Sequence, residues 1–266
     1  MSDTRPMPEF GTILAELGED HVLTVTLNRP ERLNSFNQQS LEDFTALWRY
    51  AAATGEVHVI VLKAAGDRAF CTGVDVVDGI NRKQGDPYNE TDPGFALSPK
   101  HNRCWKPLIC AVHGMAAGGA LYWLNEADII VASEDATFFD PHTTYGMVAA
   151  LEPIGLARRI PLGEVLRMVL LGNDERMSAR RALEIGFVSE VVPRDRLHER
   201  AHELAQRIAE KPTMAVQGSL KAIWESLNAT RSQALDAGLG YVQLAEANGT
   251  KRGDTPTAKG RRYEVR

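Results

Sequence analysis

Residues 106–120, KPLICAVHGMAAGGA, join a short apolar run to a segment of glycine and alanine. The apolar run, 108–112, is typical of a strand buried on both faces. The small residues after it predict the start of a helix, where the first backbone N–H groups lack intrahelical partners. Such N–H groups favour an anionic oxygen, assisted by the helix dipole. The stretch therefore predicts a strand, a turn and a helix, with a place for negative charge at the turn.

A second glycine-bearing turn, AFCTGVDV at 69–76, follows another β-branched run at 57–64. A small residue and a glycine directly after a strand let the backbone approach a ligand closely. If the two turns converge, one N–H group from each would form an oxyanion hole, usually the largest catalytic term in such chemistry. Taken alone, each turn is weak evidence, because a glycine- and alanine-rich helix start more often reflects close helix–sheet packing. Neither fits the G-x-G-x-x-G or P-loop pattern, so nucleotide binding by those routes is not indicated.

Strands and helices alternate along most of the chain, and the sequence after residue 193 is helical only. Strands are predicted from alternation and β-branched runs at 11–27 (a hairpin), 57–64, 108–112, 128–133 and 187–192. Helices are predicted from apolar spacing at 40–53, 197–208, 214–227 and 233–247. One further helix is predicted to begin at the N-cap Ser178 and stop at Gly186. We therefore expect an α/β core over 1–193 and a helical region over 194–266.

Length, charge and cysteine content exclude several classes of function. The chain has 266 residues, enough for one sizeable core, and its net charge of -5 argues against nucleic acid or an anionic membrane as the main partner. The most apolar stretch, 108–124, is too short to span a membrane. The N-terminal MSDTRPMPEF has no signal-peptide pattern. Three cysteines without a CxxC pair indicate a reduced, cytoplasmic setting, and no metal site is expected.

Five segments in order resemble the crotonase (enoyl-CoA hydratase/isomerase) superfamily over nearly the whole chain. They are LNRPERLNSFN (27–37), AFCTGVD (69–75), KPLICAVHGMAAGGA (106–120), ADIIVAS (127–133) and LLGNDERMSARRALEIGFVSEVV (170–192). The resemblance implies a spiral of ββα turns and C-terminal helices that form a homotrimer, often a dimer of trimers. It also implies an acyl-CoA thioester as substrate, in fatty-acid or other acyl-CoA metabolism, with coenzyme A as part of the substrate and no separate cofactor.

The resemblance also assigns binding residues. By position, the oxyanion donors are the backbone N–H groups of Val74 and Gly119. The CoA-binding residues are Arg32, Asn34, Thr72 and Asp75. Arg32 lies where the family often has a basic residue near the CoA phosphates, although a surface arginine is as often merely solvated.

Two family positions are occupied differently here. Family hydratases use two glutamates to handle water and the α-proton, and Tyr122 and His142 stand at those positions. A tyrosine side chain, with an ordinary pKa of about 10, is a donor at neutral pH, whereas an imidazole near about 6.5 serves as acid or base. We therefore predict Tyr122, His142 and the neighbouring Asp140 as catalytic groups, with Asp75 and Glu152 as further carboxylates that orient or replace them.

Alternative readings of single residues remain open at this point. His142 is also compatible with a hydrogen-bonded structural histidine, and Tyr122 with an apolar pocket wall. Cys71 is expected to be a small buried residue rather than a nucleophile, since no base has a partner position. His113 is expected to pack behind the second turn. The polar loop from Asp78 to about His101 is either a functional flap or a disordered insertion.

Three function hypotheses follow. The first is an acyl-CoA enzyme that stabilises a thioester enolate and catalyses hydration, isomerisation or C–C cleavage of a β-oxo acyl-CoA, the last with His142 activating water. Ordinary two-glutamate hydratase chemistry is not expected. The second is a non-catalytic acyl-CoA-binding protein on the same fold. The third is a purely structural oligomer, which predicts no CoA affinity.

Overall fold

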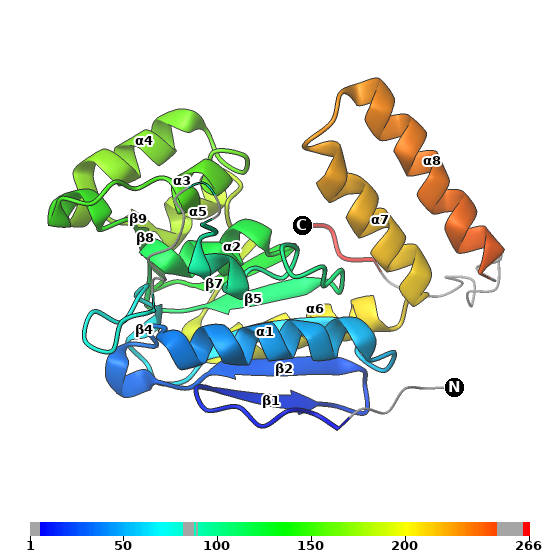
Figure 1. Cartoon of the computed structure of the whole chain (residues 1–266), viewed down its shortest axis with the longest axis horizontal. Coiled ribbons are helices and arrows are strands. Elements are labelled where there is room, and N and C mark those ends of the chain that lie inside the picture. The colour runs from blue at the N-terminus through cyan, green and yellow to red at the C-terminus, as the bar shows by residue number, and fades with distance from the viewer. Residues whose placement is uncertain (1–5, 82–87, 89, 249–262) are drawn as a thin grey trace. The chain divides into compact units, whose positions relative to one another are not determined.

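Two sheets form the first part of the chain in the computed structural model, which describes residues 6–81, 88, 90–248 and 263–266 (Figure 1). The strands are β1 (Ile13–Leu17), β2 (Val22–Leu27), β3 (Val59–Ala64), β4 (Ala69–Cys71), β5 (Leu108–Val112), β6 (Met115–Ala117), β7 (Ile129–Ser133), β8 (Thr137–Phe139), β9 (Met177–Ser178) and β10 (Glu190–Val192). The α-helices are α1 (Gln38–Ala53), α2 (Leu121–Glu126), α3 (Leu151–Leu156), α4 (Leu162–Leu171), α5 (Ala179–Glu184), α6 (Leu197–Ala209), α7 (Thr213–Ser226) and α8 (Arg231–Ala247).

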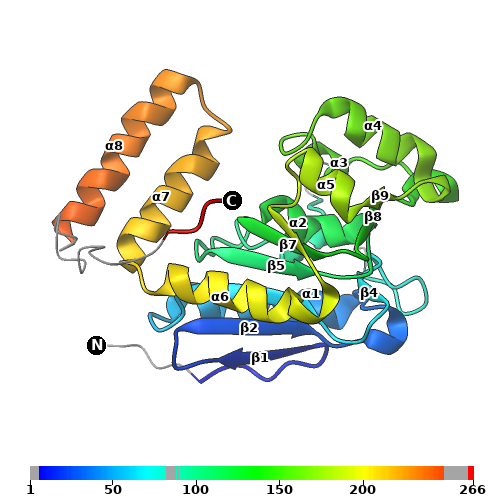
Figure 2. The same ribbon diagram turned by 180° about the vertical axis from the view of Figure 1, so that it is seen from behind.

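The larger sheet has the order β1-β2-β3-β5-β7-β10. Its first pair is the predicted antiparallel hairpin, with Ile13 opposite Leu27, and its remaining neighbours run parallel. Strand β5 is buried along its whole length, as its unbroken apolar sequence predicts. Helix α1 lies in front of this sheet in Figure 1, and α6 lies in front of it in the reverse view of Figure 2. The two helices therefore cover opposite faces.

The smaller sheet has the order β4-β6-β8-β9. Three of its strands follow strands of the larger sheet directly in sequence: β4 follows β3, β6 follows β5, and β8 follows β7. Each turn of the chain thus adds one strand to each sheet, and the neighbours β4, β6 and β8 are parallel. This is the α/β spiral of repeated units that the sequence predicts.

A cluster of buried aromatic rings connects α1 and α2 to the sheets. The indole of Trp123 packs against Phe44 with ring centroids 4.9 Å apart and meets Phe36 edge-on at 6.1 Å. The Trp48 ring lies 5.4 Å from Phe44, and its Nε1 donates to the carbonyl of Ala96 at 3.1 Å. All four rings are buried. The cluster therefore fixes the position of the chain around Phe36 and of the segment around Ala96.

Two expectations need correction. The helix predicted directly after β5 begins only at Leu121, because the chain first forms β6 and then a 3₁₀ turn, Gly118–Ala120, in which Gly118 has a left-handed φ of 51°. The strand predicted over 187–192 is confined to β10. The N–H of Phe187 bonds to the carbonyl of Ala182 at 2.9 Å, and Gly186 has a left-handed φ of 79°, so this helix-ending turn occupies the first residues of the predicted strand. Ser178 caps α5 as predicted, accepting from the N–H of Arg181.

The chain divides into two compact units, Met1–Gln206 and Arg207–Arg266. In the first unit, α6 buries Leu197 and Ala201 of its predicted apolar face, together with Ala205, whereas Leu204 is half-buried. In the second, α7 and α8 pack on each other, and Thr230 with Gln233 forms a capping box at the start of α8. The predicted helical C-terminal region is confirmed. The division after residue 193 marks the change to helical sequence and stays a prediction.

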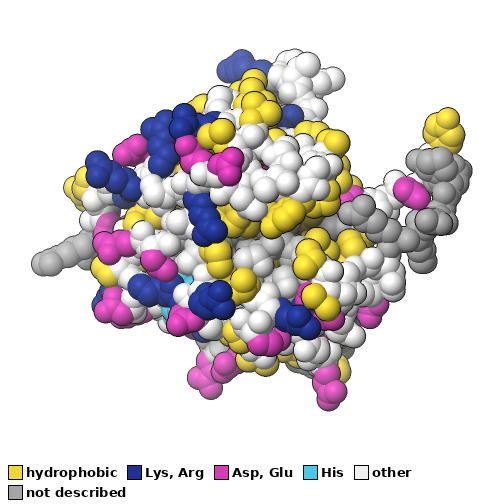
Figure 3. Space-filling view, turned by 90° about the vertical axis from the view of Figure 1, so that its left-hand side faces the viewer, with side chains coloured by type: hydrophobic (Ala, Val, Ile, Leu, Met, Phe, Trp, Pro, Cys, Tyr) yellow, Lys and Arg dark blue, Asp and Glu magenta, His cyan; other side chains and the backbone are white. Residues whose placement is uncertain are grey.

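Charged side chains on the first unit are partly paired. On the face drawn in Figure 3, Lys and Arg side chains lie next to Asp and Glu side chains. Around α4, Arg167 pairs with Glu175 and Arg181 pairs with Glu164. Within the described ranges, no helix is both long and apolar enough to cross a bilayer.

Candidate active site

The two glycine-bearing turns lie in contact. Gly73 has a left-handed φ of 91°, which a side chain rarely tolerates. A Cβ atom at this position would lie 3.2 Å from the backbone nitrogen of Gly119 and 3.4 Å from the carbonyl oxygen of Ala117. The glycine therefore lets the turn after β4 approach the turn after β6 to backbone contact. The predicted oxyanion hole depends on such a convergence of the two turns.

The strand-like segment around Val74 is held by Phe36. The N–H of Phe36 donates to the carbonyl of Gly73 at 2.9 Å, and its own carbonyl accepts from the N–H of Asp75 at 2.8 Å. Because adjacent residues of an extended chain direct their polar groups to opposite sides, this pairing directs the N–H of Val74 away from Phe36.

Arg29 connects the loop before α1 to the same turn. Its guanidinium lies 2.9 Å from a carboxylate oxygen of Asp75 and 2.7 Å from one of Asp78, and it donates to the carbonyl of Ser35 at 2.6 Å. Burial alone would raise the pKa of the Asp75 carboxyl. The N–H groups of Asp78 and Val77 and the Arg29 charge outweigh this and hold that pKa below its ordinary value. Asp75, a predicted CoA-binding residue, is thus part of the turn's support.

The other predicted CoA-binding residues occupy the same loops. The Asn34 side chain is buried and donates to the carbonyls of Ala65 and Ala69, both at 2.9 Å, so its amide group holds the loop in place. Thr72 is half-buried, with its hydroxyl 3.5 Å from the carbonyl of Leu33. Arg32 ends a short 3₁₀ turn, Pro30–Arg32, and is exposed.

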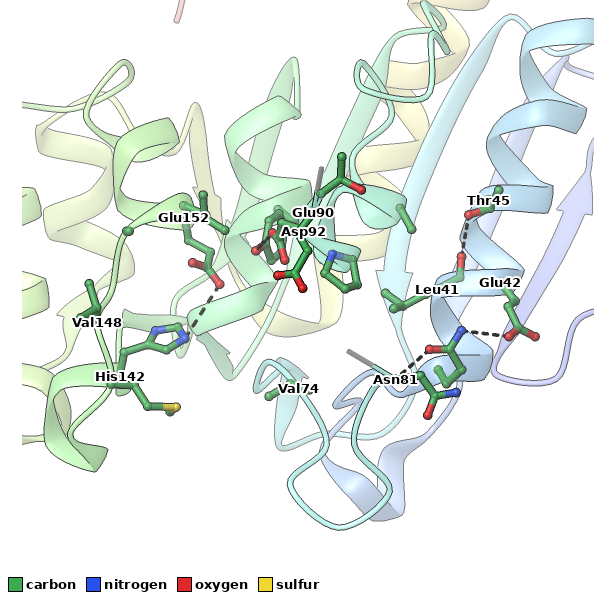
Figure 4. Close-up of a pocket in the computed structure, with 18 of the residues that line it drawn as sticks. Leu41, Glu42, Thr45, Val74, Asn81, Glu90, Asp92, His142, Val148 and Glu152 are labelled. Atoms are coloured by element: carbon green, nitrogen blue, oxygen red, sulfur yellow. Dashed lines mark hydrogen bonds and ion pairs between the residues drawn. The ribbon is translucent and has the colours of Figure 1, made fainter. Parts of the chain in front are cut away.

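A cavity of about 1260 Å³ opens beside the turns (Figure 4). Of the predicted site residues, Val74, Tyr122 and His142 line it. In Figure 4, His142, Val148 and Glu152 stand on one side, and α1 contributes Leu41 on the other. The rest of the lining mixes apolar and polar side chains, namely Gln38, Glu42, Thr45, Ala46, Arg49, Asn81, Glu90, Thr91, Asp92, Pro93, Ala96, Met147, Ala150 and Leu151.

His142 and Asp140 form a hydrogen-bonded pair at the end of β8. The imidazole Nδ1 lies 2.6 Å from Oδ1 of Asp140, which also accepts the backbone N–H of His142 at 3.0 Å. Asp140 is fully buried. A carboxylate only accepts, so Nδ1 is the donor and the neutral ring presents the Nε2 lone pair toward the cavity. This pairing is the arrangement in which a histidine acts as a base.

Glu152 approaches the same imidazole from α3. Its Oε1 lies 4.0 Å from Nε2 of His142, and the residue is 7% exposed. Burial raises the pKa of the Glu152 carboxyl above its ordinary value. His142 opposes that shift, while the negative charges of Asp140 and Asp92 add to it. From the sequence, Glu152 was predicted only as a carboxylate that orients or replaces the catalytic groups. Its position as a single charged residue in the apolar run MVAALEPIGLA could have indicated a buried, functional carboxyl group.

Tyr122 lies in the wall of the cavity with its hydroxyl engaged. The hydroxyl donates to Oδ2 of Asp92, while Oδ1 of Asp92 accepts the N–H of Gly94 at 3.2 Å. The Tyr122 ring is nearly buried and meets Phe95 edge-on at 6.3 Å. Asp92 was not identified from the sequence because its polar loop has no periodicity. In the predicted flap, residues 82–87 and 89 lie outside the described residues.

Two other titratable groups near the turns are inert by burial. Cys71 is fully buried, and burial raises the pKa of its thiol to about 12, as expected for a packing residue rather than a nucleophile. His113 is fully buried behind the second turn, where burial first, and then the charges of Arg194 and His198, lower its pKa to about 4. Among the described residues, no three His, Cys, Asp or Glu side chains are grouped as metal ligands.

Known proteins resemble this chain over most of its length. The enoyl-CoA hydratase/isomerase family profile matches residues 18–251. (E)-benzylidenesuccinyl-CoA hydratase of Thauera aromatica is 35% identical over 204 residues, 76% of this chain and 78% of that protein. 1,2-Epoxyphenylacetyl-CoA isomerase of Escherichia coli is 31% identical over 236 residues, 85% of this chain and 87% of that protein.

Solved structures agree with this assignment. The crystal structure of an enoyl-CoA hydratase/isomerase from Mycobacterium paratuberculosis superposes with a TM-score of 0.81 at 36% identity, covering 89% of this chain and 90% of that one. Enoyl-CoA hydratase subunit I from Geobacillus kaustophilus reaches the same TM-score at 28% identity, covering 97% and 99%. The chain therefore belongs to the enoyl-CoA hydratase/isomerase family of the crotonase superfamily.

Proposed function

We propose that this protein is an acyl-CoA enzyme that holds the thioester oxygen of its substrate between the N–H groups of Val74 and Gly119. The observation that carries the proposal is the backbone contact between the two turns, with the Cβ position of Gly73 only 3.2 Å from the Gly119 nitrogen. Removing an α-proton from a thioester places negative charge on this oxygen. Two donors fixed by the backbone stabilise that charge more than water does, because they need no reorganisation.

His142 and Asp140 are the proton-transfer pair in this proposal. Asp140 keeps the Nδ1 atom of His142 protonated, so Nε2 accepts a proton from the substrate or from water. Tyr122 contributes a neutral hydroxyl bonded to Asp92. With these groups at the two family positions, ordinary two-glutamate hydration is not the expected reaction. Isomerisation or C–C cleavage of a β-oxo acyl-CoA stays open.

The names of the relatives support an acyl-CoA substrate. Both (E)-benzylidenesuccinyl-CoA hydratase and 1,2-epoxyphenylacetyl-CoA isomerase are named for CoA thioesters. We propose that coenzyme A enters as part of the substrate, without a separate cofactor, and contacts the loops of Arg32 and Thr72. The cysteines Cys71, Cys104 and Cys110 are all free and buried, which supports a reducing compartment such as the cytoplasm.

Solvent exchange of the α-protons tests the proposal without knowledge of the full reaction. Butyryl-CoA is incubated with the protein in D₂O, and deuterium at the α-carbon is followed by mass spectrometry. The expected result is catalysed exchange that is lost in a Gly119→Ala variant. Failure to exchange any saturated acyl-CoA that binds would overturn the enolate mechanism.

A non-catalytic acyl-CoA-binding protein is the competing function, favoured by one observation: the Tyr122 hydroxyl is already bonded to Asp92. Calorimetric titration beside the exchange assay separates the two. Binding without exchange, and without turnover of enoyl-, β-oxo- or malonyl-type thioesters, favours the binding protein. No affinity for any CoA thioester favours a purely structural oligomer.

A further inference from the structure

The carboxyl group of Glu152 faces the imidazole of His142, and both side chains line the same side of the cavity (Figure 4). We propose that Glu152 is the second proton-transfer group of this site, a neutral carboxylic acid that returns a proton to the enolate after His142 has removed one. The inference rests on the proposed enolate chemistry and assigns its acid. Glu152 occupies neither of the two positions at which family hydratases carry their glutamates.

The geometry brings one base and one acid to the same side of the cavity. Oε1 of Glu152 and Nε2 of His142 are 4.0 Å apart, and both side chains line the cavity. The backbone carbonyl of Glu152 accepts a 2.8 Å hydrogen bond from Asn125 on α2, which anchors the start of α3. The acid is therefore held by an element other than the one that carries His142.

The surroundings of Glu152 favour its neutral form. The residue is 7% exposed, so ionisation would place a charge in a poorly solvated site. Asp140 and Asp92 are the negative groups that face it, and His142 is the facing group that favours ionisation. Burial, with the two carboxylates, outweighs the backbone N–H of Glu152 and His142 and raises the pKa of the Glu152 carboxyl above its ordinary value.

The other groups of the site are less suited to return the proton. The Tyr122 hydroxyl directs its hydrogen to Asp92. Asp140 is fully buried and bonded to Nδ1 of His142, on the far side of the ring from Nε2. Glu152 lines the cavity and, in its neutral form, can donate a proton.

The proposed cycle balances protons and electrons. Nε2 of His142 takes a proton from the α-carbon, and the C–H electron pair becomes the enolate, whose oxygen lies between the two N–H groups. The α-carbon then takes the carboxyl proton of Glu152, which restores the thioester and leaves imidazolium opposite carboxylate. The proton returns from His142 to Glu152 across the 4.0 Å gap, directly or through a solvent water.

The experiment compares α-proton exchange of butyryl-CoA in D₂O for Glu152→Gln, Glu152→Asp and the surface control Glu184→Gln. Glu184 lies on α5, paired with Arg180 and Arg181. Calorimetry with butyryl-CoA and thermal melting report binding and folding. We expect the Gln variant to lose about 10²-fold or more in exchange rate, the usual scale of one acid–base group, with binding unchanged and the control like the parent.

The pH profile separates proton transfer from a packing role. In the parent, exchange should fall as pH rises and Glu152 ionises, and the Gln variant should lack this fall. If the Gln variant also loses binding or folding, the Asp variant decides. Recovered exchange with a fall at high pH supports the proposal, and a folded, binding Asp variant without exchange overturns it.

A Gln variant that exchanges like the parent, or keeps the same fall at high pH, also overturns the assignment while leaving the enolate mechanism intact. No exchange in the parent defeats the enolate mechanism itself.

Discussion

Gly119 lies against the ring of Phe36 so closely that a Cβ atom on Gly119 would be 2.6 Å from Cζ of Phe36. The same phenylalanine forms the backbone bridge that directs the N–H of Val74. One aromatic residue, held edge-on by Trp123, thus supports both turns of the proposed oxyanion hole. The glycine is required for space as well as for an accessible N–H group.

Gly119→Ala is expected to lower α-proton exchange of butyryl-CoA by about 10²–10³-fold, roughly 2.7–4 kcal/mol, because the methyl group and Phe36 cannot both keep their places. Gly163→Ala is the matched control, since nothing lies within 4 Å of a Cβ at that position on α4. The double variant Gly119→Ala/Phe36→Leu should regain part of the rate. An unchanged rate in the single variant would contradict the role of this turn.

His142→Ala is expected to abolish exchange and turnover while leaving the affinity for CoA thioesters nearly unchanged, since the loops of Arg32 and Thr72 that are proposed to contact coenzyme A do not include His142. Asp140→Asn should also lower the rate, because an amide no longer holds the Nδ1 proton in the way the carboxylate does at 2.6 Å. Rate constants and calorimetric affinities measured on both variants check this. A His142 variant that works beside a Gly119 variant that does not would transfer the chemistry to Tyr122 or Asp140.

Hydration of crotonyl-CoA is expected to be orders of magnitude slower than in a two-glutamate hydratase, because each acid or base step contributes about 10²–10⁴-fold. The loss of absorbance of the enoyl thioester measures this directly. Tyr122→Glu/His142→Glu, which restores the family residues, should raise the rate if the positions correspond. A parent turnover in the hydratase range would show that Tyr122 and His142 replace the two glutamates effectively in hydration.

The sequence predicted the parts of the site that depend on local chain geometry. Gly73 follows β4 and Gly119 follows β6. These two strands are parallel neighbours, so the turns that follow them lie at the same edge of the sheet. His142 and Asp140 are two residues apart, so their contact needs only a turn. Family resemblance supplied the correspondence of Tyr122 with a catalytic position.

The contacts that decide proton transfer could not be read from the sequence. Asp92 and Tyr122 are 30 residues apart, and Asp92 lies in a polar loop whose path no periodic pattern specifies. Glu152 reaches His142 only because α3 folds back over the end of β8, a tertiary event. The short extent of β10 likewise depends on a distant partner, since only Glu190–Val192 pair with β7.

His113 is expected to make the fold sensitive to mild acid. Burial lowers the pKa of this histidine to about 4 from its ordinary value of 6.5, so on acidification the unfolded chain takes up the proton at a higher pH than the folded chain does. Stability present above pH 6.5 is therefore lost as pH falls toward 4, by up to about 1.4 kcal/mol per pH unit. Denaturant unfolding of His113→Leu should show a weaker loss over this range, and His202→Gln, at a half-buried histidine paired with Asp20, is the comparison variant. An identical pH dependence in parent and His113 variant would contradict the assignment.

The C-terminal helices are expected to form a trimer or a hexamer. On α8, Leu235, Leu239 and Val242 recur at helical spacing and are each half or more exposed. On α7, Ile223 is 65% exposed, and Leu227 at the C-cap one turn later is 46% exposed. Such an apolar stripe on a water-facing helix favours burial against another chain, and the crotonase resemblance implies trimers. Sedimentation velocity should give a trimer or hexamer for the parent.

Leu239→Glu should shift that assembly toward monomer, because it places a charge in the middle of the stripe, whereas Gln243→Glu, a nearby polar position on the same helix, should leave the assembly intact. A parent that sediments as a stable monomer at micromolar concentration would remove the argument. A Leu239 variant that assembles like the parent would show that a surface other than α8 joins the subunits.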